Sequence, residues 1–170
     1  MTRLVTAEEY DLPAELSVSF TGHRADKLPW GFDEDDERCA AFRQKLESEI
    51  IRAYNEGARY FLSGMADGVD LYAAEAVLRL SAKLKEIKLV AVFPYGRGDS
   101  RRKKRCAGRA FRVVSLHESY TPSCYMDRNR FLVRHSSRLI CGFSGDAASG
   151  TGATMRMARE AGLGLVILSV

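Results

Sequence analysis

Residues 60–70 combine features that strongly restrict what the chain can fold into. The stretch begins with a short apolar run, Ser63 and Gly64 follow as a turn, and a segment containing Gly68 leads into the alanine-rich residues 71–78. The apolar run predicts a strand, the glycines permit a turn where a Cβ would clash, and the alanines favour a helix. In an open α/β sheet, such a turn lies at the carboxyl end of a strand, where ligands bind. The unpaired N–H groups that open the helix carry partial positive charge, so they suit a phosphate or another anion.

Two further glycine turns follow predicted strands in the same way. Residues 16–20 alternate apolar and polar side chains and predict a strand that ends in a turn over residues 21–24. The strand predicted over residues 139–143 ends in a glycine-rich turn over residues 144–152. Because the carboxyl ends of parallel strands lie along one edge of a sheet, the three turns predict a single site for a phosphate-bearing ligand.

The rest of the chain alternates predicted strands with predicted helices, which implies right-handed βαβ units and a mostly parallel sheet. Acidic residues 33–37 open a helix that Gly57 ends, and the nearly all-apolar residues 87–93 predict a strand buried on both faces. Residues 1–14 show no sustained period, so we expect an irregular leader before a single domain over residues 15–170. The helix that begins with the alanine-rich residues 71–78 is expected to reach about residue 83. Further helices are expected at about 99–113, 124–133 and 153–161, and further strands at about 114–116 and 165–168.

The composition is typical of a globular protein, since 46% of the 170 residues are hydrophobic and 28% are charged. No run approaches the roughly 20 apolar residues that span a bilayer, and the N-terminus lacks the pattern of a signal peptide. We therefore expect a cytoplasmic protein that does not enter a membrane. The four cysteines lie far apart and form no C-x-x-C pair, so we expect reduced thiols and no metal site.

The net charge of +4 is unevenly distributed along the chain. Basic side chains gather between residues 97 and 112, and they are suited to contact nucleic acid or a polyphosphate. A solvated helix face or loop is the favoured interpretation, because residues 101–105 include no aromatic ring for base stacking. A nucleic-acid contact would use Arg101, Arg102, Lys103, Lys104 and Arg105.

The candidate residues for binding a ligand or its phosphate lie in the three turns and in one later predicted helix. They are Thr21, Gly22, His23, Arg24, Ser63, Gly64, Asp67, Gly68, Asp70, Arg128, Asn129, Ser149, Gly150, Thr151 and Gly152. The glycines either let the backbone approach a phosphate or simply permit a turn. The guanidinium of Arg24 can bind two oxygens at once, and His23 fits either a general acid or base or a side chain held by a loop hydrogen bond.

Asp70 and Glu75 are the candidate catalytic carboxylates. Asp70 is suited to hold a ribose hydroxyl or to polarise a water. On an ideal helix, the five-residue spacing places the two side chains about 140° apart, so a mechanism with paired carboxylates is not favoured.

Several motifs resemble those of the YpsA-like branch of the SLOG superfamily. That superfamily also contains the Smf/DprA DNA-processing proteins and the Lonely Guy phosphoribohydrolases. Residues 19–24, followed by Lys27-Leu28-Pro29, resemble the opening signature of the branch, and residues 61–70 resemble its second motif. Later landmarks that match are Pro94-Tyr95, Tyr120-Thr121, Arg128-Asn129-Arg130 and the phosphate turn Ser149-Gly150-Thr151. The resemblance covers about residues 16–168 and implies an α/β Rossmann-like domain, a mostly parallel sheet flanked by helices, and a nucleotide-derived ligand.

Three departures from the family pattern leave the identity of that ligand open. The family usually has acidic residues where Arg134 and Ser137 stand. It has Gln and Trp in the segment that is basic here, and a glycine where the late turn has Ser149.

Three functions follow from these observations. The first is binding, including as a sensor, of a nucleotide-derived molecule such as ADP-ribose, NAD or a nucleoside monophosphate. The second is cleavage of an N-glycosidic bond in a nucleoside 5′-monophosphate. The Lonely Guy signature places a glutamate soon after its Gly-Thr pair, however, and this chain has no acid there until Glu160. The third is single-stranded nucleic-acid binding through the basic run. Separately, we expect by analogy that the protein forms a homodimer through an exposed helix face.

Overall fold

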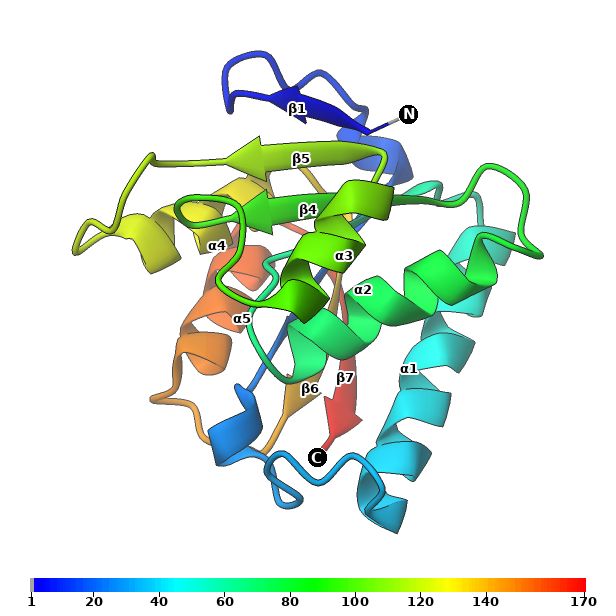
Figure 1. Cartoon of the computed structure of the whole chain (residues 1–170). Helices are drawn as coiled ribbons and strands as arrows, with labels where there is room; N and C mark the ends of the chain where they lie inside the picture. Colours follow the sequence, from blue (N-terminus) through cyan, green and yellow to red (C-terminus); the bar gives the residue numbers. More distant parts are fainter. Residues whose placement is uncertain (1) are drawn as a thin grey trace.

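The computed structural model describes residues 2–170. Its seven strands form one parallel sheet (Figure 1). The strand order across the sheet is β1-β5-β4-β3-β2-β6-β7, and every neighbouring pair is parallel. This confirms the predicted α/β fold. The strands are β1 (Arg3–Val5), β2 (Ser17–Gly22), β3 (Tyr60–Ser63), β4 (Lys88–Phe93), β5 (Arg112–Ser115), β6 (Arg138–Phe143) and β7 (Gly164–Ser169).

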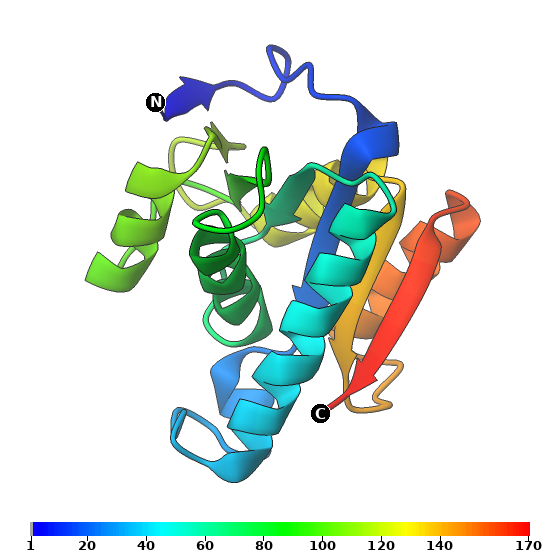
Figure 2. The same cartoon turned by 90° about the vertical axis from the view of Figure 1, so that its right-hand side faces the viewer.

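Five α-helices cover the two faces of the sheet. Helices α1, α2 and α3 pack on one face, and α4 and α5 pack on the other (Figures 1 and 2). Two 3₁₀ turns precede and follow β2. The helices are α1 (Glu37–Asn55), α2 (Val69–Leu80), α3 (Arg101–Arg109), α4 (Cys124–Arg134) and α5 (Gly150–Glu160), and the 3₁₀ turns are η1 (Ala14–Leu16) and η2 (Ala25–Lys27).

Strand side chains alternate between the two apolar layers. Phe61 and Leu89 face the α1–α3 layer, whereas Leu62 and Val90 face α4. Five of the six residues of β4 are buried, as the apolar run over residues 87–93 predicted.

Side-chain caps set the starts of three helices. Asp36 accepts a hydrogen bond from the N–H of Arg38, Ser100 accepts one from Lys103, and Ser149 accepts one from Gly152. Because Ser149 is the cap, α5 begins at Gly150, three residues earlier than the sequence predicted.

The chain reverses its direction across the sheet between β2 and β6. It first proceeds outward from β2 through β3 and β4 to β5, and then α4 carries it back to β6 on the other side of β2. In open α/β sheets the ligand cleft lies at such a switch point, outside the carboxyl ends of the strands. Strands β2, β3 and β6, which precede the three glycine turns, are adjacent in the sheet, so the turns converge there.

The N-terminal segment differs from the expected irregular leader. Residues 3–5 form β1, which pairs in parallel with β5, and Val5 and Tyr10 pack into the apolar layer under α4. A three-residue strand is too short to show a period, and its conformation depends on a partner more than 100 residues away. Smaller differences are that α2 ends at Leu80 and that β5 begins at Arg112.

All four cysteines are free and buried. Within residues 2–170, no helix has the length and apolar content needed to cross a membrane. The same residues contain no group of three or more His, Cys, Asp or Glu side chains arranged to hold a metal ion.

Candidate functional site

The three glycine turns surround a cavity of about 480 Å³, which we call the turn cavity. Its walls come from the ends of β2 and β6, the turn before α2, the start of α5 and one side of α4. It is lined by Thr21, Gly22, His23, Arg24, Lys27, Ala66, Asp70, Tyr125, Arg128, Asn129, Ser144, Asp146, Ser149, Gly150 and Thr151. Ten of these residues are candidates from the sequence, so the structure brings most of that set together.

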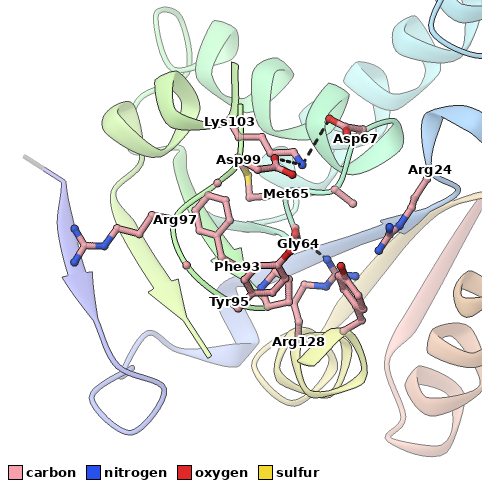
Figure 3. A pocket seen from close by; sticks show the side chains of 15 residues that line it. Arg24, Gly64, Met65, Asp67, Phe93, Tyr95, Arg97, Asp99, Lys103 and Arg128 are labelled. Atoms are coloured by element: carbon pink, nitrogen blue, oxygen red, sulfur yellow. Dashed lines mark hydrogen bonds and ion pairs between the residues drawn. The ribbon is translucent and has the colours of Figure 1, made fainter. Parts of the chain in front are cut away.

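A second cavity of about 220 Å³ adjoins the first, and we call it the tyrosine cavity (Figure 3). Arg24, Ala66, Tyr125 and Arg128 line both cavities, so the two form one cleft. The other lining residues are Gly64, Met65, Asp67, Phe93, Pro94, Tyr95, Gly96, Arg97, Gly98, Asp99 and Lys103. Sequence reasoning missed this cavity, although the Pro94-Tyr95 turn at the end of β4 was a usable signal because it lies on the same sheet edge.

His23 ties the first turn to the third. Its Nε2 accepts a hydrogen bond from the N–H of Ser144 at 3.0 Å, and its ring stacks on Phe143 with 5.9 Å between centroids. Burial lowers the pKa of His23, and the carboxylate of Asp146 partly opposes that shift. A neutral ring with a free Nε2 lone pair is what the Ser144 bond requires, so His23 positions the loop that leads into α5.

The second turn forms the floor of the cleft. The buried Ser63 hydroxyl donates to the carbonyl of Asp70 at 2.8 Å and accepts from the N–H of Met65 at 3.2 Å, and Ser63 lines neither cavity. The first N–H of α2, at Val69, donates to the carbonyl of His23 at 3.4 Å. This N–H is therefore not free to bind a phosphate.

Two candidate glycines serve close packing between turns. At Gly68, φ is +100° and a Cβ would lie 2.6 Å from the carbonyl oxygen of His23. At Gly152, a Cβ would lie 2.4 Å from the carbonyl oxygen of Ala147. Neither glycine lines a cavity, so both act by letting backbone segments approach each other.

The start of α5 faces the turn cavity. Gly150 and Thr151 are its first two residues and both line the cavity, while Ser149 caps the N–H of Gly152. A Cβ at Gly150 would meet no atom within 4 Å, so open space lies beside it. The positive end of an 11-residue helix therefore borders the cavity.

Asp70 and Arg128 lie buried beneath the cleft. The Oδ2 of Asp70 accepts from the N–H of Ala66 at 3.3 Å, while its Oδ1 is buried and has no hydrogen-bond partner in the protein. Burial raises the pKa of Asp70, and the positive charge of Arg128 opposes that shift. Arg128 donates to the carbonyl of Gly64 at 2.9 Å and to the Oδ1 of Asn129 at 3.1 Å.

Arg24 lies over the ring of Tyr125, with 4.7 Å between the guanidinium carbon and the ring centroid. Its side chain is exposed and lines both cavities. Among residues 2–170, neither Arg24 nor Arg128 makes an ion pair with a carboxylate. The cleft therefore presents arginines that form no ion pair, Arg97 in the tyrosine cavity included, and only the nearby charge of Asp70 partly offsets that of Arg128.

Glu75 is not part of the cleft. Both of its carboxylate oxygens accept from Arg102, at 2.9 and 2.6 Å, and it lines neither cavity. Arg102 also donates to Glu34, at 2.5 and 2.8 Å, and these two acids raise the pKa of Arg102. The structure therefore gives no support to the proposed catalytic role of Glu75.

The basic run is also less available than the sequence suggested. Arg102 is held by two carboxylates, and Lys103 is buried with its ammonium 2.9 Å from Asp99. Arg101, Lys104 and Arg105 are exposed. Two of the five residues predicted to contact nucleic acid thus hold α3 in place.

Comparison with known proteins gives two matches. The family model described as the YspA SLOG family matches residues 18–162, from β2 to just beyond α5. A UPF0398 protein of Ligilactobacillus salivarius (strain UCC118) is 24% identical over 80 residues. That alignment covers 47% of this chain and 43% of the relative, so the chain spans less than half of the relative's length. The family match includes every element that contributes to the cleft.

Proposed function

Because the chain belongs to the YspA SLOG family, we propose that its cleft binds a nucleotide or a nucleotide-derived small molecule. The candidate ligands are nucleoside monophosphates, ADP-ribose and NAD. In this proposal the ligand's phosphate lies in the turn cavity, between the start of α5 and the guanidinium of Arg24. The carboxylate of Asp70 accepts a hydrogen bond from a ribose hydroxyl.

The observation that carries the proposal is the pair of arginines without carboxylate partners. Burying a charge is costly unless it is paired, and Arg128 is only 7% exposed. Burial lowers the pKa of Arg128, and the negative charge of Asp70 opposes that shift only in part. An anionic ligand offsets the remaining cost of burial, and guanidinium groups bind phosphate oxygens two at a time.

The unpaired Oδ1 of Asp70 supports the same site independently. A buried carboxylate oxygen without a donor is costly, and Asp70 lines the turn cavity. A ribose hydroxyl is a donor of suitable size for this position. A phosphate is less suited to this position, because the ionised form of Asp70 would repel it.

The proposal is tested by calorimetric titration of AMP, ADP-ribose and NAD into the wild-type chain and into two arginine variants. Arg24→Gln removes the guanidinium next to the proposed phosphate position. We expect at least a tenfold loss of affinity, since hydrogen bonds to charged groups contribute about 1.5–3 kcal/mol. Arg130→Gln is the matched control. Arg130 lies on α4, is exposed and pairs with Asp127 at 3.6 Å outside the cleft.

Binding of at least one compound, weakened in Arg24→Gln and unchanged in Arg130→Gln, supports the proposal. Failure of all three compounds to bind the wild-type chain would contradict it. If the wild-type chain, Arg24→Gln and Arg130→Gln bound the compounds with equal affinity, the ligand site would lie away from Arg24.

Asp70 also favours a second candidate function, hydrolysis of the N-glycosidic bond of a nucleoside 5′-monophosphate. A buried carboxyl group with a raised pKa is suited to act as a general acid. Glu75, the other candidate carboxylate, is held by Arg102, so the reaction would depend on Asp70. Release of free base from nucleoside monophosphates, abolished in Asp70→Asn, would establish this activity, and its absence in the wild-type chain would exclude it.

A further inference from the structure

We infer that the tyrosine cavity holds the aromatic base of the ligand, so that the ligand is a nucleoside phosphate and not a sugar phosphate alone. This inference rests on the proposed function, because it takes the turn cavity as the place of the phosphate. It adds a second subsite, made by the ends of β3 and β4, the start of α3 and one side of α4.

Aromatic side chains form one wall of the tyrosine cavity. Phe93, Tyr95 and Tyr125 all line it (Figure 3). Tyr95 and Tyr125 meet edge to face, with 6.4 Å between centroids and 70° between planes. Stacking on aromatic faces is how proteins hold nucleobases without requiring a particular sequence.

Three charged side chains in the wall of the tyrosine cavity pair with one another, whereas its three arginines make no ion pair among residues 2–170. The ammonium of Lys103 lies 2.9 Å from a carboxylate oxygen of Asp99 and 3.7 Å from one of Asp67 (Figure 3). Lys103 is buried, and its single positive charge offsets only one of the two carboxylates, so this group stays negative. The carboxylates still have lone pairs that accept from the N–H groups of a base. The part of the wall made by Lys103, Asp99 and Asp67 therefore suits a neutral heterocycle with N–H donors better than it suits a phosphate.

The arrangement of the two cavities matches the order of groups in a nucleotide. Arg24, Tyr125 and Arg128 line both cavities, so a ligand that enters both must cross this boundary. Asp70, whose Oδ1 has no partner, lines the turn cavity near Arg128. A ribose at the boundary would therefore place the base beside Tyr95 and the phosphate beside Gly150.

The test compares AMP, ribose 5-phosphate and inorganic phosphate by calorimetric titration. We expect wild-type affinity to be roughly tenfold or more higher for AMP than for ribose 5-phosphate, because stacking of a base on an aromatic ring has about that effect. Tyr95→Leu keeps apolar bulk but removes the ring. It should lower the affinity for AMP by about the same factor and leave the affinity for ribose 5-phosphate unchanged.

Tyr120→Leu is the matched control, because Tyr120 contacts Tyr95 at 6.0 Å between centroids but lines neither cavity. We expect it to bind AMP as the wild-type chain does. Equal wild-type affinity for AMP and ribose 5-phosphate would overturn the base subsite while leaving the proposed function intact. Equal loss of both ligands in Tyr95→Leu would also overturn it, since Tyr95 would then support the whole cleft. Binding of none of the three compounds would overturn the proposed function as well.

Discussion

At the scale of single residues, His23 has the clearest consequence for pH dependence. The pKa of the folded ring lies below its ordinary value of 6.5 because burial disfavours the charged form. The unfolded chain therefore binds more protons than the folded chain as pH falls through and below 6.5, and stability decreases in that range. Protonation at Nε2 also removes the acceptor for the N–H of Ser144.

We predict that affinity for AMP falls more steeply below pH 6.5 in the wild-type chain than in His23→Gln, whose side-chain carbonyl accepts a hydrogen bond at every pH. His135 is the control, because burial lowers its pKa too but its ring packs on Tyr10 and Phe131 away from the cleft. His135→Gln should therefore follow the wild-type affinity profile. Calorimetric titrations between pH 5 and 7.5 measure the three profiles, and identical profiles in wild type and His23→Gln would contradict the positioning role.

Residue patterns in the sequence indicated Arg24, Asp70, Gly150 and Thr151, because each follows a predicted strand at the ligand edge of the sheet. The same patterns could not separate them from Glu75. Its partner Arg102 lies 27 residues along the chain, and local spacing does not reveal such a pair.

At the scale of elements, the glycine turns separate into two kinds. Gly68 must be glycine for the fold, because its φ is +100° and a Cβ would collide with the backbone of His23. Gly150 faces open space in the turn cavity. Sequence alone could not distinguish the two, since both read as glycines in a strand-end turn.

We predict that alanine at Gly68 lowers the stability of the fold, whereas alanine at Gly150 lowers the affinity for the ligand. Gly68→Ala should lower the free energy of unfolding by about 1–3 kcal/mol, because it adds backbone strain and a collision. Gly150→Ala should change that free energy by no more than about 0.5 kcal/mol. It should lower the affinity for AMP severalfold, because the added methyl group fills space next to the helix start. Denaturant unfolding and calorimetric titration of both variants measure these quantities. A stable Gly68→Ala, or a Gly150→Ala that binds AMP normally, would contradict the assignment.

Most elements were predictable from local patterns, because buried strands are apolar runs and helices show alanine-rich or amphipathic spacing. Their exact starts depend on capping residues such as Ser149, which the prediction did not identify. Strand β1 was not, because its three residues become a strand only by pairing with β5.

At the scale of the whole molecule, the cleft depends on the order of strands in the sheet. That the three turns lie on one edge of the sheet follows from parallel strands alone and was predictable, whereas their convergence also needs β2 between β3 and β6. The tyrosine cavity was not, because it needs β4 next to β3 and α4 packed on the opposite face from α3. Those are long-range arrangements that no local pattern specifies.

The central claim is that a nucleotide phosphate binds at the start of α5, and amide resonances of the ¹⁵N-labelled chain test it most directly. On titration with AMP, the account predicts that the backbone N–H resonances of Gly150 and Thr151 shift strongly, because a phosphate there accepts hydrogen bonds from them. The N–H of Val69, already bonded to the carbonyl of His23, should shift little. Shifts that leave Gly150 and Thr151 unmoved would contradict the account.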